Sequence, residues 1–200
     1  MSEKQTVKSE KKTNIKRLAL TAVLIGMATV LSLIKVYQLP LGGSITLLSM
    51  LPITLISIEY GLGWGTLASL IYSFIQFGFG IAEGVFGWGL SPLALVGCII
   101  LDYILAYSVL GFAGMFRKKG TVGICIGVFL AVVARFACHL LSGAIIFDIW
   151  MPEDWSNPWL YSLAYNGSYM LPELIFTMIG AVVLFKTPQF SKFVESNLEK

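Results

Sequence analysis

The sequence contains few charged residues. Asp, Glu, Lys and Arg make up only 12% of the 200 residues, against roughly 25% in an ordinary soluble domain. Hydrophobic residues account for 56%. This composition excludes a typical soluble domain and predicts an integral membrane protein.

Several motifs of catalysis and energy coupling are also missing. The chain has no GxxxxGK[ST] phosphate loop, so it cannot hydrolyse ATP as a P-loop enzyme. It has no GxSxG or HExxH motif, and its three cysteines lack metal-ligand or CxxC spacing. The net charge of +3 comes mainly from basic residues that flank the apolar segments. Such residues determine the orientation of a membrane protein, so the charge does not indicate nucleic-acid binding. The sequence therefore favours a binder or carrier without cofactor or metal over an enzyme.

Apolar segments near the length of about 20 residues that crosses a bilayer fill most of the chain. They are 17–38, 44–60, 62–82, 91–115, 121–148 and 159–186. We therefore expect an all-α bundle of six transmembrane helices over residues 16–186. Residues 1–15 are expected to be a disordered basic tail, and residues 187–200 a cytoplasmic C-terminal tail.

Basic residues are distributed unevenly between the two sides of this expected bundle. Six of the 14 Lys and Arg lie within the first 17 residues, and others follow in the 116–120 loop and after the last segment. The opposite connections carry Glu83, Glu153 and Asp154 and no Lys or Arg. Because Lys and Arg are enriched in cytoplasmic loops, both termini are predicted to be cytoplasmic.

Three ionisable residues, Asp102, Arg135 and Glu173, lie well inside long apolar segments. Such residues indicate a functional site by default. One face of the fifth segment carries four residues spaced by four: Arg135, His139, Gly143 and Phe147. That face combines a cation, an imidazole, a gap and an aromatic ring.

Polar residues from three segments reach a similar depth in the external half. By helical rise, Asp102, His139 and Asn166 lie about 10 to 15 Å from the external ends of their segments. Glu173 lies about 10 Å deeper than Asn166 and is expected to fall outside that level. Because separate burial against lipid is costly, the shared level predicts one cavity that opens outward. Its groups suit a small, flat, cationic heterocycle.

Structural roles are alternatives for the same residues. Asp102 and Arg135 could form an ion pair that joins two helices, and His139 could be a hydrogen-bonding partner between helices. Tryptophan side chains are typical of membrane interfaces.

Four stretches resemble one family of membrane proteins. They are LPLGGSITLLSMLPI (39–53), LDYILAYSVLGFAG (101–114), RFACHLLSGAIIF (135–147) and YSLAYNGSYMLPE (161–173). Together they are similar to the thiamine-specific substrate-binding subunit of energy-coupling factor transporters. The resemblance covers about residues 16–186 and implies a six-helix bundle in the plasma membrane of a prokaryotic cell. It also implies high-affinity thiamine binding, a transmembrane coupling subunit and two ABC ATPases as partners.

The resemblance assigns substrate-binding positions. They fall on Asp102, Tyr103, Arg135, His139, Gly143, Phe147, Tyr161 and Asn166, with Trp150 as a possible substitute for Phe147. We expect Asp102 to balance the thiazolium charge, and His139, Tyr161 and Asn166 to hydrogen-bond the aminopyrimidine. Phe147 or Trp150 would stack on that ring. Arg135 and Tyr103 would face the hydroxyethyl end.

A small-xxx-small pair, Ala22 and Gly26, lies in the first segment and permits close helix approach. By resemblance this face docks on the coupling subunit, and packing within the chain is the alternative. Other functions also stay open: a sister subunit for riboflavin or biotin, a stand-alone carrier coupled to ions through Asp102 and Glu173, or a membrane enzyme.

Overall fold

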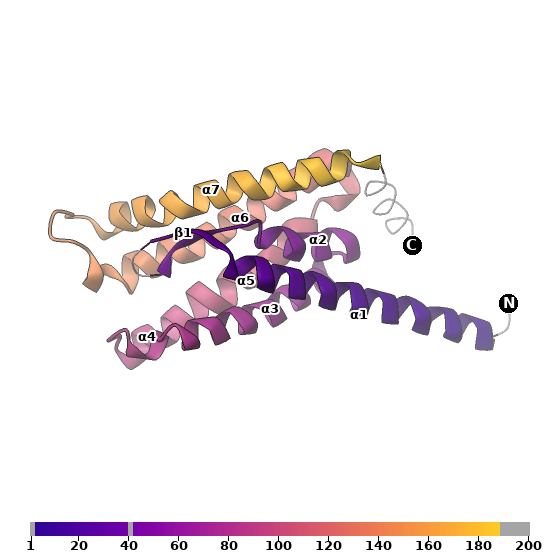
Figure 1. Ribbon diagram of the computed structural model, residues 1–200, viewed down its shortest axis with the longest axis horizontal. Coiled ribbons are helices and arrows are strands. Elements are labelled where there is room, and N and C mark those ends of the chain that lie inside the picture. The colour runs from indigo at the N-terminus through magenta and orange to yellow at the C-terminus, as the bar shows by residue number, and fades with distance from the viewer. Residues whose placement is uncertain (1–2, 40–41, 189–200) are drawn as a thin grey trace.

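The computed structural model describes residues 3–39 and 42–188, and most of them are helical. The long helices are α1 (Glu3–Leu33), α2 (Met50–Tyr60), α3 (Leu62–Ala82), α6 (Gly120–Ile145) and α7 (Pro158–Lys186). Between α3 and α6 lie η2 (Val85–Gly87), α4 (Pro92–Cys98), the π-helix η3 (Ile99–Leu105), α5 (Ala106–Ser108), η4 (Val109–Gly114) and η5 (Arg117–Lys119). Strands β1 (Lys35–Gln38) and β2 (Ser44–Thr46) follow α1, and η6 (Asp148–Trp150) precedes α7. The start of α1 and the end of α7 lie at the same end of the molecule (Figure 1).

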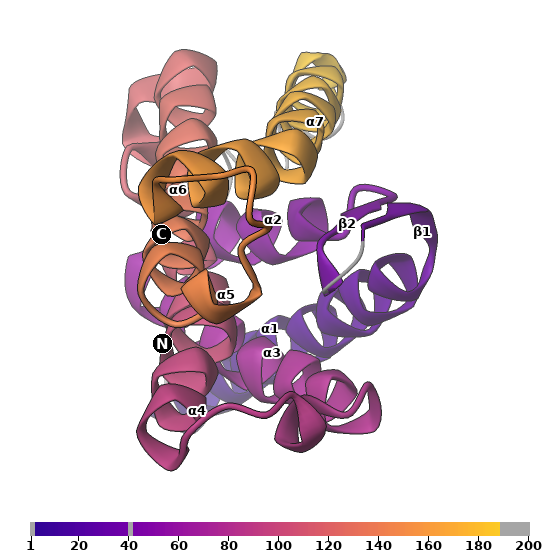
Figure 2. The same ribbon diagram turned by 90° about the vertical axis from the view of Figure 1, so that its left-hand side faces the viewer.

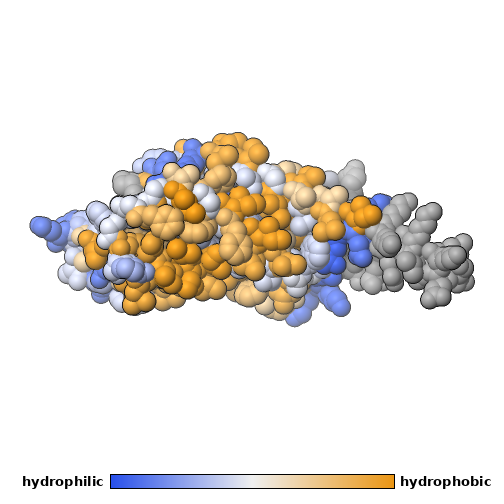
Figure 3. All heavy atoms as spheres, turned by 90° about the horizontal axis from the view of Figure 1, so that it is seen from below, coloured by the Kyte–Doolittle hydropathy of each residue, from blue (hydrophilic) through white to orange (hydrophobic). Residues whose placement is uncertain are grey.

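The described helices have the surface of a membrane protein. Four segments among them are long and apolar enough to cross a bilayer: Asn14–Leu33, Leu62–Ala82, Pro92–Ile145 and Pro158–Lys186. Figure 3 shows hydrophobic residues across the middle of one face and hydrophilic residues toward its two ends. The segment Pro92–Ile145 contains two helical runs, which are separated by η5.

Two helices start where local sequence caps them. The side chain of Asn157 accepts hydrogen bonds from Trp159 N at 2.9 Å and Leu160 N at 3.3 Å, and Pro158 follows it at the start of α7. Ser91 and Pro92 begin α4 in the same way. A polar cap followed by proline satisfies free N–H groups and sets φ for the first turn.

The chain between the first two long helices differs from the sequence prediction. Helix α1 ends at Leu33, and β1 and β2 form an antiparallel hairpin in which Tyr37 pairs with Ile45. Aromatic and β-branched residues favour strands, and Gly42 takes a φ of 97° between them. The predicted spans 17–38 and 44–60 were therefore too long.

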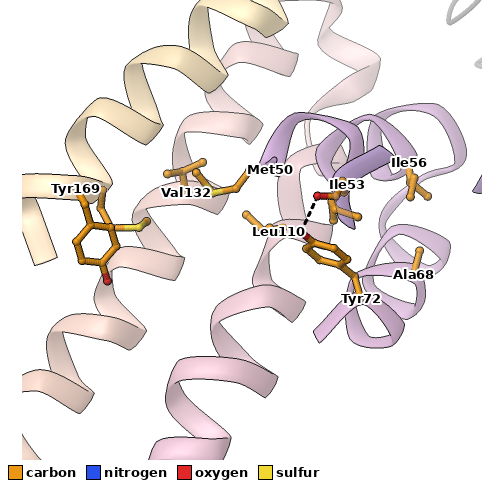
Figure 4. Packing of buried hydrophobic residues seen from close by; sticks show 10 residues of the cluster. Met50, Ile53, Ile56, Ala68, Tyr72, Leu110, Val132 and Tyr169 are labelled. Atoms are coloured by element: carbon orange, nitrogen blue, oxygen red, sulfur yellow. Dashed lines mark hydrogen bonds between the residues drawn. The ribbon is translucent and has the colours of Figure 1, made fainter. Parts of the chain in front are cut away.

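Helix α2 is a buried core element. Its 11 residues extend about 16 Å, too short to cross a bilayer. Ile53 and Ile56 are fully buried, and they pack with Tyr72 of α3 and Leu110 of η4 in one cluster (Figure 4). The hydroxyl of Tyr72 donates to the carbonyl of Ala28 at 3.2 Å, which ties α1 to this cluster.

The two terminal predictions have different outcomes. Residues 3–15, which the sequence predicts to be disordered, belong to α1. Glu, Lys and Gln are good helix formers, and a helix that has nucleated in the apolar part extends through them at little cost. Of the predicted tail 187–200, all but residues 187 and 188 lie outside the described residues.

Basic side chains gather at the end of the molecule where α2 meets α3. Arg117 donates to the carbonyls of Ile58 at 3.1 Å and Glu59 at 2.6 Å, so its charge caps the C-terminus of α2. The guanidinium of Arg17 lies 3.7 Å from the ring centre of Trp64. The basic part of α1, the α2–α3 turn and the η5 loop therefore lie together.

Candidate functional site

A cavity of about 390 Å³ lies toward the opposite end, beside the hairpin. Seen from that end, the hairpin lies between α7 and α1 (Figure 2). Eight of the nine predicted substrate-binding residues line the cavity: Asp102, Tyr103, Arg135, His139, Gly143, Phe147, Tyr161 and Asn166. Its volume is in the range of sites for small molecules, about 300 to 1,000 Å³.

The two candidate stacking residues lie in different places. Phe147 lines the cavity, and its ring meets that of Trp88 edge-on with 5.9 Å between centroids. Trp150 is not among the lining residues and is 47% exposed. Of these two candidates, Phe147 is therefore the one that lines the cavity.

Asp102 lies on the π-helix η3 and faces α6. Its Oδ1 is 2.8 Å from Nδ1 of His139, and its Oδ2 accepts a hydrogen bond from the hydroxyl of Ser142. π-Helical turns are rare in proteins, and those that occur often lie at functional sites. The wide turn thus places a carboxylate against two α6 side chains that lie one helical turn apart.

Arg135 contacts His139 and Tyr107, and it forms no ion pair with Asp102 in the described chain. Its Nε–H donates to Nε2 of His139 at 3.4 Å, and its guanidinium lies 4.1 Å from the ring centre of Tyr107. The result is a chain of polar contacts from Asp102 through His139 to Arg135.

Asn166 connects α7 to α6. Its Nδ2 donates to the carbonyl of Ser162 at 3.0 Å and to that of His139 at 3.2 Å. Its Oδ1 accepts from the hydroxyl of Tyr169 at 2.7 Å. Asn166 therefore positions the two helices at the cavity as well as lining it.

Gly143 is required for this close approach of α6 and α7. A Cβ at this position would lie 2.9 Å from Nδ2 of Asn166 and closer still to Oγ of Ser162. We expect Gly143→Ala to separate the helices and break the contacts of Asn166, with an affinity loss of about tenfold or more for a ligand in the cavity. Gly167→Ala is a matched control because no atom lies within 4 Å of its added Cβ. Calorimetry on both variants checks this, and equal affinities would contradict it.

The hairpin supplies cavity residues that the sequence prediction missed. Lys35 Nζ lies 2.7 Å from Oε1 of Glu83 at the end of α3, and the backbone N–H of Gly43 donates to the hydroxyl of Tyr165 at 3.0 Å. Sequence reasoning assigned this stretch to membrane helices, so it had no reason to place it against α3 and α7.

Glu173 corrects an expectation. The sequence places it below the level of the other polar groups, yet it lines the same cavity. Strand β2 reaches down to it, and Oε1 accepts hydrogen bonds from Thr46 N and, at 2.7 Å, from Thr46 Oγ1. The cavity is therefore deeper than the polar residues of α6 and η3 indicate.

Gln76 and Tyr107 are further lining residues that sequence reasoning missed. The hydroxyl of Tyr107 donates to Oε1 of Gln76 at 3.2 Å, and Nε2 of Gln76 donates to the hydroxyl of Tyr72 at 2.8 Å. An amide in an apolar helix is itself a signal of interhelical hydrogen bonding. That signal could have identified Gln76.

Ala22 and Gly26 lie on the outer face of α1. Both are exposed, and no atom lies within 4 Å of a Cβ added to Gly26. Their neighbours Val23, Met27 and Val30 are also exposed. Among the described residues, the exposure of this pair gives no support to the alternative that it packs against another helix of the same chain.

A helical membrane protein with a deep polar cavity at one end of its bundle belongs to the class that binds a small polar molecule within the bilayer. The sequence model of the thiamine transporter protein family matches residues 18–192. The chain belongs to this family.

Individual relatives agree with this assignment. The chain is 31% identical over 185 residues to the thiamine transporter ThiT of Bacillus subtilis, covering 86% of this chain and 91% of that protein. It is 24% identical over 148 residues to ThiT of Lacticaseibacillus paracasei, covering 68% and 70%. The solved structure of ThiT from Listeria monocytogenes superposes with a TM-score of 0.70 at 25% identity, covering 91% of this chain and 98% of that one.

Proposed function

We propose that this protein is the thiamine-binding membrane subunit of an energy-coupling factor importer. It captures thiamine from outside the cell and delivers it by associating with a transmembrane coupling subunit and two ABC ATPases. The observation that carries the proposal is the cavity. In it, this member of the thiamine transporter family places a carboxylate, Asp102, beside an imidazole and aromatic rings.

The acidic side chains of the cavity favour a cation. Apart from His139 and the tyrosines, its ionisable side chains are Asp102, Glu83, Glu173, Arg135 and Lys35. Lys35 pairs with Glu83, and Asp102 forms no ion pair with Arg135 among the described residues, so its carboxylate can face a thiazolium.

We assign the roles within the cavity from the chemistry of its lining residues. Asp102 balances the thiazolium, while His139, Tyr161 and Asn166 hydrogen-bond the aminopyrimidine. The stacking role goes to Phe147, because Trp150 lies outside the cavity. Arg135 and Tyr103 face the hydroxyethyl end.

The basic end of the molecule is the proposed cytoplasmic side. The clustering of Arg17 and Arg117 there supports the positive-inside orientation, with both termini in the cytoplasm and the cavity open to the outside. The chain would make six passes. Five are helical, namely α1, α3, the run from α4 to η4, α6 and α7, and one consists of the hairpin followed by α2.

Binding to the purified full-length protein tests the proposal. Trp88 forms part of the cavity wall, so we expect saturable quenching of tryptophan fluorescence by thiamine and none by riboflavin or biotin. The absence of thiamine binding would overturn the proposed ligand. In proteoliposomes, thiamine uptake should require the coupling subunit, the ATPases and ATP, whereas uptake by the subunit alone under an ion gradient would identify a secondary carrier.

A further inference from the structure

Glu173 has a buried side-chain oxygen without a hydrogen-bond partner among the described residues. The residue is only 4% exposed and lines the deep end of the cavity. Both hydrogen bonds from Thr46 go to Oε1, and Oε2 has none. Buried carboxylate oxygens are nearly always satisfied, so this oxygen needs a partner that the described residues do not supply.

The surroundings of Glu173 favour a hydroxyl donor. Glu173 lines the same cavity as Arg135, which the proposed function places at the hydroxyethyl end of thiamine. Along α7, Glu173 lies about 10 Å deeper than Asn166, by helical rise. The amino group of the pyrimidine is therefore at the other end of the ligand, and the hydroxyl is the donor left for Glu173.

We propose that Glu173 is a further ligand-contacting residue, whose free carboxylate oxygen accepts a hydrogen bond from the hydroxyl of bound thiamine. The inference rests on the proposed function and adds a determinant of specificity to it. A free hydroxyl is bound and an ester at that oxygen is rejected, because the ester has no donor and a phosphate ester would also bring negative charge to the carboxylate.

Two substitutions separate this contact from a purely structural role. In Glu173→Gln the amide oxygen can still accept both hydrogen bonds from Thr46, but an NH2 group replaces the accepting oxygen. Thr46→Val removes the side-chain donor to Oε1 and leaves Oε2 unchanged. Thr177→Val is the matched control on α7, because Thr177 is fully buried one turn away and does not line the cavity.

We expect Glu173→Gln to lower thiamine affinity by about tenfold to a hundredfold, the effect of one charge-assisted hydrogen bond. Thr46→Val should cost about threefold or less, since the hairpin keeps its backbone bond to Glu173, and Thr177→Val should bind as the wild type does. An effect of Thr46→Val as large as that of Glu173→Gln, or an unchanged affinity in Glu173→Gln, would overturn the proposal.

An analogue with ethyl in place of hydroxyethyl tests the same contact on the unmodified protein. The wild type should bind this analogue about tenfold or more weakly than thiamine, and Glu173→Gln should cause no further loss for it. Equal binding of analogue and thiamine by the wild type overturns the contact without any variant. Failure of the wild type to bind thiamine at all would instead refute the proposed function.

Discussion

Asp102→Asn lowers the affinity of the purified protein for thiamine by about a hundredfold or more, equivalent to ~3 kcal/mol. The substitution removes the negative charge that faces the thiazolium in a site shielded from water. It also replaces an acceptor by a donor opposite His139 or Ser142, both of which now donate to the carboxylate. Calorimetric titration of the variant measures the loss.

Ser142→Ala is the companion variant for this experiment. It removes one hydrogen bond to Asp102 and keeps the charge, so we expect an affinity loss of about tenfold or less. Asn has nearly the shape of Asp, and the hydroxyl of Ser142 can turn to accept a hydrogen bond from the new amide group. The thermal unfolding of ligand-free Asp102→Asn should therefore stay close to that of the wild type. If Asp102→Asn binds thiamine as the wild type does, Asp102 is not the counter-ion.

Replacing both Ala22 and Gly26 by Leu abolishes thiamine uptake by the assembled importer and preserves thiamine binding by the isolated subunit. Both positions are exposed on α1, and no atom lies within 4 Å of a Cβ added at Gly26. The two leucines therefore leave the cavity unchanged. They do prevent the close backbone approach of a partner helix that a small-xxx-small face permits. Uptake in proteoliposomes and calorimetry on the same preparation check the two halves of this result.

Gly78→Leu is the matched control on another membrane-facing surface. Gly78 is exposed on α3, and no atom lies within 4 Å of its added Cβ. This variant should take up and bind thiamine as the wild type does. Full uptake by the Ala22 and Gly26 double variant would instead show that this face of α1 is not the docking surface.

The sequence predicts the α6 part of the site well because helix geometry alone determines it. Residues spaced by four share one helix face, and Arg135, His139 and Gly143 of α6 all line the cavity. Phe147 lines it too, although it lies beyond the end of α6. Asp102 was added to the predicted site because it lies at a depth in the bilayer similar to that of His139. These inferences required no knowledge of which helices are neighbours.

The other side of the cavity depends on tertiary contacts that no local pattern specifies. The hairpin is apolar enough to be taken for parts of two membrane helices, and its descent toward Glu173 depends on the hydrogen bonds of Thr46. Depth along α7 alone therefore excluded Glu173 from the site. The pairing of Lys35 with Glu83 was invisible for the same reason.

The π-helix η3 also has a genetic consequence. A π-helical turn is equivalent to one residue inserted into an α-helix, so deletion of a single residue such as Ile100 would restore α-helical geometry. Because the wide turn absorbs the extra residue, the helical parts before and after the deletion would keep about their present orientation. Such a frame-preserving deletion would hardly change the hydropathy profile, yet it would remove the wide turn that holds Asp102 against His139 and Ser142. When homologous sequences are aligned, a one-residue gap in this segment should therefore be placed so that the carboxylate positions match.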